Sequence, residues 1–189
     1  GKPDIIALMA QGDEGVFIYY NEGNGKFREE AVARFPPVYG SSDFQLLDYN
    51  NDGLIDFLTT NGDNADYSIS LKAYHGIRIF LNNGKNKFNE VVFLPVNGIQ
   101  KAMPVDFDRD GDMDIVSISF FPDYKNRPAE SFIYWENEGD NAYKRYSFPE
   151  ANDGRWMTMD AGDMDGDGDT DIILGSASFS FGEVPQQYK

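Results

Sequence analysis

The sequence contains no cysteine and only one histidine. The absence of cysteine excludes disulfide bonds, thiolate zinc sites and cysteine nucleophiles, and it leaves the compartment open. No apolar run approaches the ~20 residues that a membrane-spanning helix requires. The first residues also lack the charged and then apolar profile of a secretory signal peptide. We therefore expect no insertion of this chain into a membrane.

Basic residues are few, with 16 Lys and Arg against 32 Asp and Glu, and the net charge of the 189 residues is -16. This surplus of negative charge repels phosphate backbones and anionic lipid surfaces. Nucleic acid is therefore not an expected partner. Apolar residues make up 41% of the chain and aromatic residues 15%, which is sufficient for a folded core at this length.

Aspartate is abundant, and much of it falls in a nine-residue loop that occurs three times. The first Asp loop (48–56) starts at Asp48, the second (106–114) at Asp106 and the third (163–171) at Asp163, so the starts are 58 and 57 residues apart. An apolar stretch typical of a short buried strand follows each loop. These stretches are 57–60, 115–118 and 172–175.

Three other apolar segments repeat with the Asp loops. One precedes each loop, at 44–47, 102–105 and 156–159. Another runs into a turn that contains glycine, at 18–23, 79–84 and 133–139. A further strand begins near Phe27, Phe88 and Tyr143. The pattern therefore predicts four short strands in each repeat.

A fixed period of 57 or 58 residues with four strands is typical of a β-propeller blade. No segment has sustained helical periodicity, so the predicted fold class is all-β, with blades of four antiparallel strands. Closed propellers have about four to eight blades, and we count about three and a half. We expect the remaining propeller blades or another chain to cover the open ends. The predicted units are a partial blade at 1–43, blades at 44–101 and 102–155, and a partial blade at 156–189.

The residue pattern of the Asp loops predicts calcium binding. Calcium prefers about six to eight oxygen ligands, and side chains at loop positions 1, 3, 5 and 9 can converge on one ion. Position 7 contributes its backbone carbonyl, and glycine at position 6 allows the sharp turn. We therefore predict about three complete Ca²⁺ sites. Their ligands are Asp48, Asn50, Asp52, Leu54 and Asp56; Asp106, Asp108, Asp110, Asp112 and Asp114; and Asp163, Asp165, Asp167, Asp169 and Asp171.

Other interpretations of the Asp loops are weaker. Clusters of Asp, Asn and Gly also mark simple turns, but three copies in register with the strands favour a metal site. An EF-hand needs a glutamate at position 12, where this chain has Thr59, Ser117 and Leu174. Magnesium is less suited because it retains water ligands and demands a tighter octahedral geometry.

The Asp loop, the strand after it and the Asn-Gly turn together resemble the FG-GAP repeat, also called the VCBS-type repeat. This repeat occurs in integrin α-subunit propellers and in many bacterial surface proteins, and the resemblance covers nearly the whole chain. It implies a seven-bladed propeller with calcium in the loop between the first and second strands of a blade. The literal Phe-Gly and Gly-Ala-Pro signatures are not evident in each repeat, so the bacterial variety is the closer match.

Strands of a four-stranded antiparallel blade alternate in direction, so calcium and the second connections belong on opposite faces. The second connections are long, at 61–76 and 121–131. Aromatic and basic residues there and in the links between blades suit a protein or glycan partner. The alternative is that these side chains pack over blade edges. The candidate partner-binding residues are Tyr39, Tyr67, Tyr74, Tyr124, Arg127 and Arg155.

These features predict a non-catalytic, calcium-stabilised binding or adhesion module. Calcium loops of this kind suit the high ion concentrations of an extracellular, cell-surface or periplasmic setting. No catalytic constellation is visible, and we expect the single histidine, His75, to be a solvated loop residue. Two alternatives stay open. The chain could belong to a carbohydrate-active lyase or hydrolase with catalytic groups elsewhere, or it could be a passive structural subunit of a larger assembly.

Overall fold

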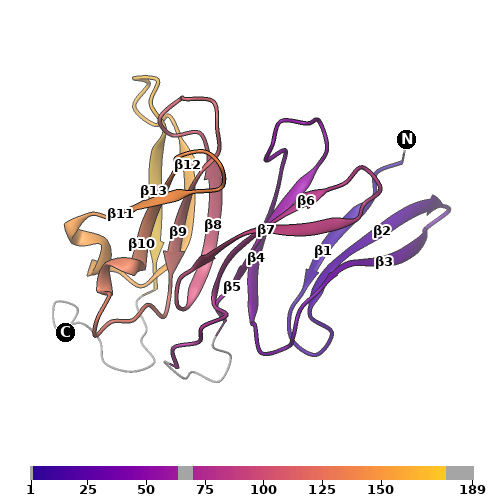
Figure 1. Ribbon diagram of the computed structural model, residues 1–189, viewed down its shortest axis with the longest axis horizontal. Helices are drawn as coiled ribbons and strands as arrows, with labels where there is room; N and C mark the ends of the chain where they lie inside the picture. Colours follow the sequence, from indigo (N-terminus) through magenta and orange to yellow (C-terminus); the bar gives the residue numbers. More distant parts are fainter. Residues whose placement is uncertain (1, 64–69, 178–189) are drawn as a thin grey trace.

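The computed structural model describes residues 2–63 and 70–177, and β-strands dominate this part of the chain (Figure 1). Two short 3-10 helices are the only helical elements within it. The strands are β1 (Ile5–Met9), β2 (Gly15–Gly23), β3 (Lys26–Arg34), β4 (Ser41–Leu47), β5 (Asp56–Asn61), β6 (Gly76–Asn82), β7 (Phe88–Pro95), β8 (Ile99–Val105), β9 (Asp114–Ser119), β10 (Phe132–Asn137), β11 (Tyr143–Tyr146), β12 (Trp156–Gly162) and β13 (Asp171–Ser176).

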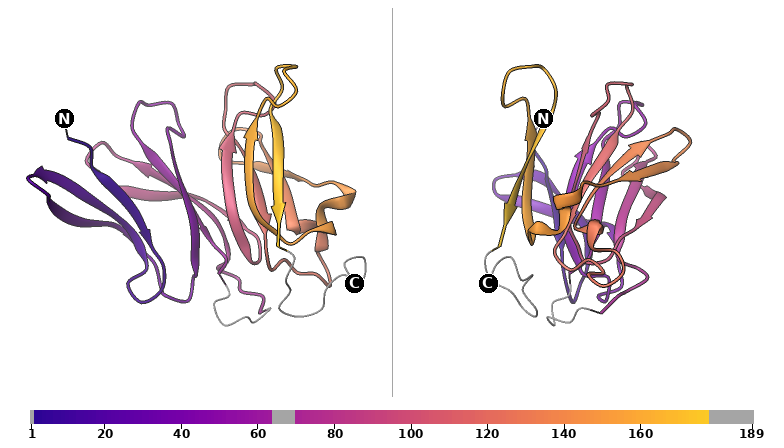
Figure 2. Two further views of the ribbon diagram at one scale, coloured as in Figure 1. Left: turned by 180° about the vertical axis from the view of Figure 1, so that it is seen from behind. Right: turned by 90° about the vertical axis from the view of Figure 1, so that its left-hand side faces the viewer.

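The strands form four antiparallel sheets, in which each strand pairs with the next one along the chain. Their orders are β1-β2-β3, β4-β5-β6-β7, β11-β10-β9-β8 and β12-β13. We number these sheets first to fourth along the sequence. They lie side by side in that order (Figures 1 and 2). The predicted all-β fold of antiparallel blades is confirmed, with four strands in each of the second and third sheets.

Hydrophobic cores lie between neighbouring sheets rather than within them. Leu58 and Ile79 of the second sheet belong to the same buried cluster as Ile115 and Trp135 of the third sheet. The central strands β5 and β9 are buried along their whole length, because neighbours cover both faces of their sheets. A single sheet of this kind cannot bury its apolar residues alone, which explains why the repeats occur in series.

First strands of successive sheets are neighbours, and they hold the sheets together. Ser42 Oγ of β4 donates a hydrogen bond to the carbonyl of Ile99 in β8 at 3.0 Å. Lys101 Nζ of β8 donates to the carbonyl of Met159 in β12 at 3.2 Å. Pro104 is tolerated within β8 because this strand is an edge of its own sheet, where a missing N–H breaks no ladder.

The Asp loops and the long second connections lie at opposite ends of the sheets. Each Asp loop joins the first strand of a sheet to the second, and all three project at the top of Figure 1. The described parts of the second connections of the second and third sheets lie at the bottom. The connection between β9 and β10 contains the 3-10 helix η1 (Pro128–Ser131), and the link between β11 and β12 contains η2 (Pro149–Asp153). The sequence periodicity predicted neither helix. In the part of the chain that the structure describes, no helix has the length and apolar character needed to cross a membrane.

Candidate metal centres and the opposite loop face

The backbone of each Asp loop turns through left-handed residues at positions 4 and 6. In the second Asp loop these are Arg109, with φ of 63°, and Gly111, with φ of 98°. A glycine takes this conformation without a steric penalty, so the predicted role of position 6 is confirmed. Gly53 and Gly168 occupy the same position with φ of 84° and 93°.

The carboxylates of each loop accept hydrogen bonds from the backbone of the same loop. In the second Asp loop, Asp106 accepts from the N–H of Gly111 at 3.2 Å and Asp108 from that of Asp110 at 3.2 Å. Asp110 in turn accepts from the N–H of Asp112 at 3.0 Å. The first and third Asp loops repeat all three bonds. Each such bond leaves further oxygen lone pairs for a cation.

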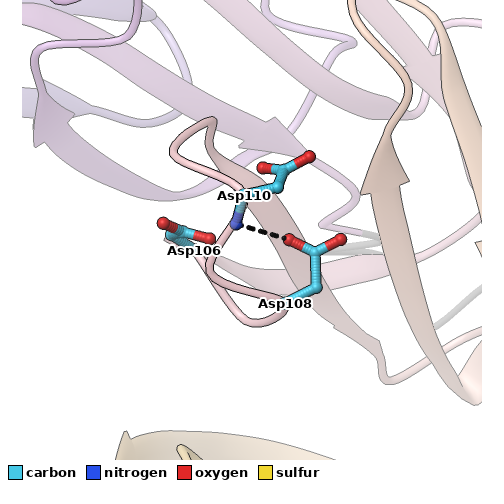
Figure 3. A group of neighbouring side chains, drawn as sticks. All are labelled: Asp106, Asp108 and Asp110. Atoms are coloured by element: carbon cyan, nitrogen blue, oxygen red, sulfur yellow. Dashed lines mark hydrogen bonds between the residues drawn. The ribbon is translucent and has the colours of Figure 1, made fainter.

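Carboxylates converge in the second and third Asp loops. Oxygens of Asp106, Asp108 and Asp110 lie within 4.8 Å of one another, and Figure 3 shows these three side chains around the turn. Asp163, Asp165 and Asp171 converge within the same limit. In the first Asp loop an amide, Asn50, stands at position 3. The predicted ligands outside these two clusters are Asp48, Asn50, Asp52, Leu54, Asp56, Asp112, Asp114, Asp167 and Asp169. Coordination of an ion by any of the predicted ligands stays a prediction.

Two observations fit a hard cation in the second Asp loop. Asp106 Oδ1 and Asp112 Oδ1 are buried, and neither has a hydrogen-bond partner among the described residues. Burial and the charge of Asp110 raise the pKa of the Asp112 carboxyl to about 6. Burial and the surrounding carboxylates likewise raise the pKa of Asp108. An oxygen-seeking divalent cation would compensate both the missing contacts and the repulsion, and this donor set suits calcium.

The aspartate at position 9 does more than the sequence predicts. Asp56 is fully buried, and its two oxygens accept from the N–H of Tyr49 at 2.9 Å and of Asn82 at 2.8 Å. Asp114 is also fully buried and accepts from the corresponding N–H groups, those of Phe107 and Asn137. Position 9 therefore ties the Asp loop to the end of the third strand of the sheet. Neither carboxylate belongs to a converging cluster, whereas Asp171 of the third loop does.

An asparagine that the sequence analysis did not single out braces the first and second Asp loops. Asn82 Nδ2 donates to the carbonyl of Ile55 in the first Asp loop at 3.0 Å, while its Oδ1 accepts from the N–H of Gly84 at 3.0 Å. Asn21 and Asn137 make the same pair of bonds in their own sheets. The available signal was the Asn-x-Gly spacing, which occurs in all three turns and which we interpreted only as a turn.

Contacts also join the Asp-loop end of one sheet to that of the next. Tyr49 of the first Asp loop meets Tyr143 of the third sheet, with 2.9 Å between their hydroxyl oxygens. Arg109 of the second Asp loop forms a 3.0 Å ion pair with Asp169 of the third. This pair is largely exposed, so we assign it a role in positioning rather than a stabilising energy.

On the opposite face, most of the described candidate partner-binding residues pack against neighbours. The rings of Tyr39 and Tyr74 stack with centroids 5.2 Å apart. Tyr124 donates to a backbone carbonyl at 2.7 Å, and the guanidinium of Arg155, only 6% exposed, lies over its ring. Arg127 is exposed and pairs with Glu130 at 3.2 Å. Tyr67 lies outside the described residues.

His75 is not the solvated residue that we expected. Its side chain is 1% exposed, and its Nδ1 accepts a hydrogen bond from the N–H of Gly98 at 3.2 Å. Burial and the charge of Lys72 lower the pKa of the His75 imidazole to about 4, so the ring is neutral near pH 7. The reason is tertiary, because the link between the second and third sheets closes over this loop residue.

Two cavities lie at this face, on either side of Arg127. One of about 330 Å³ is lined by the residues before β6, the link between β7 and β8, and Arg127. The other, of about 290 Å³, is lined by residues of η1, β10 and β11, and again by Arg127. Both volumes fall near the lower end of the ~300–1,000 Å³ that is typical of small-molecule sites.

A comparison with protein families supports the repeat structure. The model of the FG-GAP-like repeat matches residues 1–59, 60–117 and 106–174, which together span most of the chain. A search of curated proteins found no significant match.

Proposed function

Because this chain belongs to the FG-GAP-like repeat family, we propose that it is a calcium-stabilised, non-catalytic binding module. Its partner is a protein or a glycan, and it binds at the face opposite the Asp loops. The observation that carries this proposal is the separation of the two ends of the sheets. Converging carboxylates occupy one end, and the two cavities on either side of Arg127 occupy the other.

The Asp loops supply the structural half of this function. Side chains at positions 1, 3, 5 and 9 and the carbonyl at position 7 would hold Ca²⁺, and the ion would supply positive charge among carboxylates that otherwise repel one another. In the first and second Asp loops, the position-9 aspartate and Asn82 or Asn137 then keep the loop fixed on its sheet. Calcium therefore stabilises the scaffold, and recognition takes place at the other end.

The same chemistry supports the proposal of an extracellular, cell-surface or periplasmic location. Calcium sites built from loops are occupied at the high free calcium outside the cytosol. The proposal of a module without catalysis rests on His75, the only histidine, which is buried with one nitrogen already bonded to Gly98.

Differential scanning calorimetry tests the calcium half. We expect excess calcium to raise the midpoint of unfolding well above that measured with a chelator, since binding to the folded state alone stabilises it. Magnesium at the same concentration should raise the midpoint less. An unchanged midpoint with and without chelator would contradict a stabilising role for calcium.

Array screening of the calcium-loaded chain tests the binding half. We expect a glycan or protein ligand whose binding is weakened by substitutions around Arg127 and is unaffected by substitutions on exposed β3. Binding that depends on β3 instead would favour a passive structural subunit. Turnover of any bound saccharide would contradict the absence of catalysis.

A further inference from the structure

The two cavities on either side of Arg127 offer different chemistry, and together they define a ligand. The first cavity, about 330 Å³, brings Lys72, His75, Asn97 and Arg127 together between the second and third sheets. The second, about 290 Å³, adds Glu130 and Arg145 on the far side of Arg127. Because they share Arg127 as a wall, one ligand could occupy both.

The first cavity contains a buried hydrogen-bond donor without an acceptor. Nδ1 of His75 accepts from the N–H of Gly98 at 3.2 Å, so the proton of the neutral ring is on Nε2. Nε2 is buried and has no partner in the described part of the chain. Such a group costs free energy unless an acceptor reaches it. The Nε2–H group of His75 therefore needs an oxygen acceptor, which a ligand or water would supply.

Positive charge gathers around this donor in a chain whose net charge is -16. Lys72 forms no ion pair with any residue in 2–63 or 70–177. Arg127 and Arg145 both approach the same oxygen of Glu130, at 3.2 and 3.5 Å. The three cations outnumber the two carboxylates near them, Glu130 and Asp123. The pKa of Asp123 is lowered by its hydrogen bond to Asn126 and in part by Arg127. An anion would therefore be attracted here despite the overall charge.

The second cavity contains the opposite deficiency, an acceptor without a donor. Glu130 Oε2 is buried and has no hydrogen-bond partner among the described residues, although Oε1 is bonded to Arg127. The rest of this wall includes the apolar side chains of Ala129 and Ile133. A hydroxyl group next to an apolar surface would satisfy Glu130.

We propose that this pair of cavities binds an acidic saccharide, with the carboxylate of a uronic acid at Lys72, His75 and Arg127. A hydroxyl of the same or the adjoining sugar donates to Glu130. A uronic acid carries an anion and several hydroxyl donors on one ring, so it supplies what both cavities lack. This inference rests on the proposed function, and it specifies the ligand class for the same face.

Isothermal titration calorimetry of the calcium-loaded chain with trigalacturonic acid tests the inference. We expect binding by the unchanged chain and a loss of affinity of about tenfold or more in Lys72→Gln, because a charge-assisted bond to the ligand is removed. His75→Asn should also weaken binding, since it can keep an acceptor toward Gly98 but removes the Nε2 donor. Lys125→Gln, an equal change of charge at an exposed residue of the neighbouring connection, should bind as the unchanged chain does.

The methyl-esterified trimer provides the matched ligand, because it keeps the hydroxyls and loses the charge. The inference predicts that it binds far more weakly than the acid. Equal binding of both trimers, or equal affinity of Lys72→Gln and Lys125→Gln, would overturn the inference, as would no binding of trigalacturonic acid at all. If hexaglutamate binds instead and depends on Lys72, the saccharide is wrong while binding at this face stands. If a ligand found by array screening binds without any dependence on this face, the proposed function itself fails.

Discussion

At the scale of single residues, one carboxylate often serves two purposes in this chain. Asp106 accepts a hydrogen bond from the N–H of Gly111 through Oδ2, and its Oδ1 is buried with no partner among the residues that the structure describes. One oxygen thus shapes the loop while the other is available to a cation. The asparagines of the third-strand turns are likewise shared, between their own turn and a neighbouring Asp loop.

Replacing Asn82 tests that brace. Asn82→Ala removes the 3.0 Å bonds to the carbonyl of Ile55 and from the N–H of Gly84. We expect the free energy of unfolding to fall by about 1–2 kcal/mol, because each lost bond contributes roughly 0.5–1.5 kcal/mol. Urea unfolding with saturating calcium measures the difference. Asn83→Ala removes one exposed hydrogen bond and should lower the free energy of unfolding by only about a few tenths of a kcal/mol. An equal loss of stability in both variants would contradict the bracing role of Asn82.

His75 should make stability depend on pH. The folded-state pKa of about 4 is below the usual 6.5, so the unfolded chain binds a proton more readily. The contribution is therefore complete above pH 6.5 and is lost as the pH falls toward 4, by about 3 kcal/mol in total. Urea unfolding of the unchanged chain and of His75→Asn, across this range with saturating calcium, isolates the effect. Parallel stability curves for the two proteins would contradict it.

At the scale of elements, sheets are joined where backbones approach too closely for a side chain. Gly98, just before β8, has φ of 59°, and a Cβ there would overlap the carbonyl oxygen of Phe121. Its carbonyl also accepts the N–H of Phe120 at 2.9 Å. The link between the second and third sheets therefore lies directly against the end of β9, and this contact also closes over His75.

A pair of glycine substitutions separates crowding from backbone strain. Gly98→Ala combines the left-handed φ with the overlap at Phe121, whereas Gly12→Ala has φ of 55° and no atom within 4 Å of the new Cβ. We expect Gly12→Ala to lower the free energy of unfolding by about 1 kcal/mol. Gly98→Ala should lower it by about 3 kcal/mol or more. Urea unfolding measures both, and similar values would show that the close approach contributes little.

At the scale of the whole molecule, the surplus of acid opposes compaction. The net charge is -16, and the converging carboxylates of the second and third Asp loops concentrate part of it at one end of the sheets. Contacts such as the ion pair between Arg109 and Asp169 bring successive Asp loops close to one another. The repulsion is therefore shared between sheets as well as within a single loop.

This repulsion predicts a dependence on salt that calcium should remove. Without calcium, raising sodium chloride should raise the melting temperature, because salt screens like charges that are exposed. With saturating calcium the same salt increase should have a smaller effect. Thermal melts followed by circular dichroism at several salt concentrations measure both slopes. Equal slopes in the two conditions would contradict a role for calcium in relieving the repulsion.

The repeat period, the strands and the family follow from the sequence alone. Each needs only local information: the apolar stretches at 57–60 and 115–118, the Asp spacing, and a glycine whose φ the loop demands. Even the opposite placement of the Asp loops and the long connections follows, since consecutive antiparallel strands must reverse direction.

Tertiary structure decided the rest, because it depends on which groups meet across sheets. The burial of His75, the packing of Tyr39 against Tyr74 and the second role of Asp56 all arise from partners distant along the chain. The cavity between Lys72 and Arg127 exists only because the second and third sheets stand next to each other. The sequence therefore determined the strands and Asp loops of each blade. The packing of the blades against one another decided where buried polar groups lack a hydrogen-bond partner that a ligand could supply.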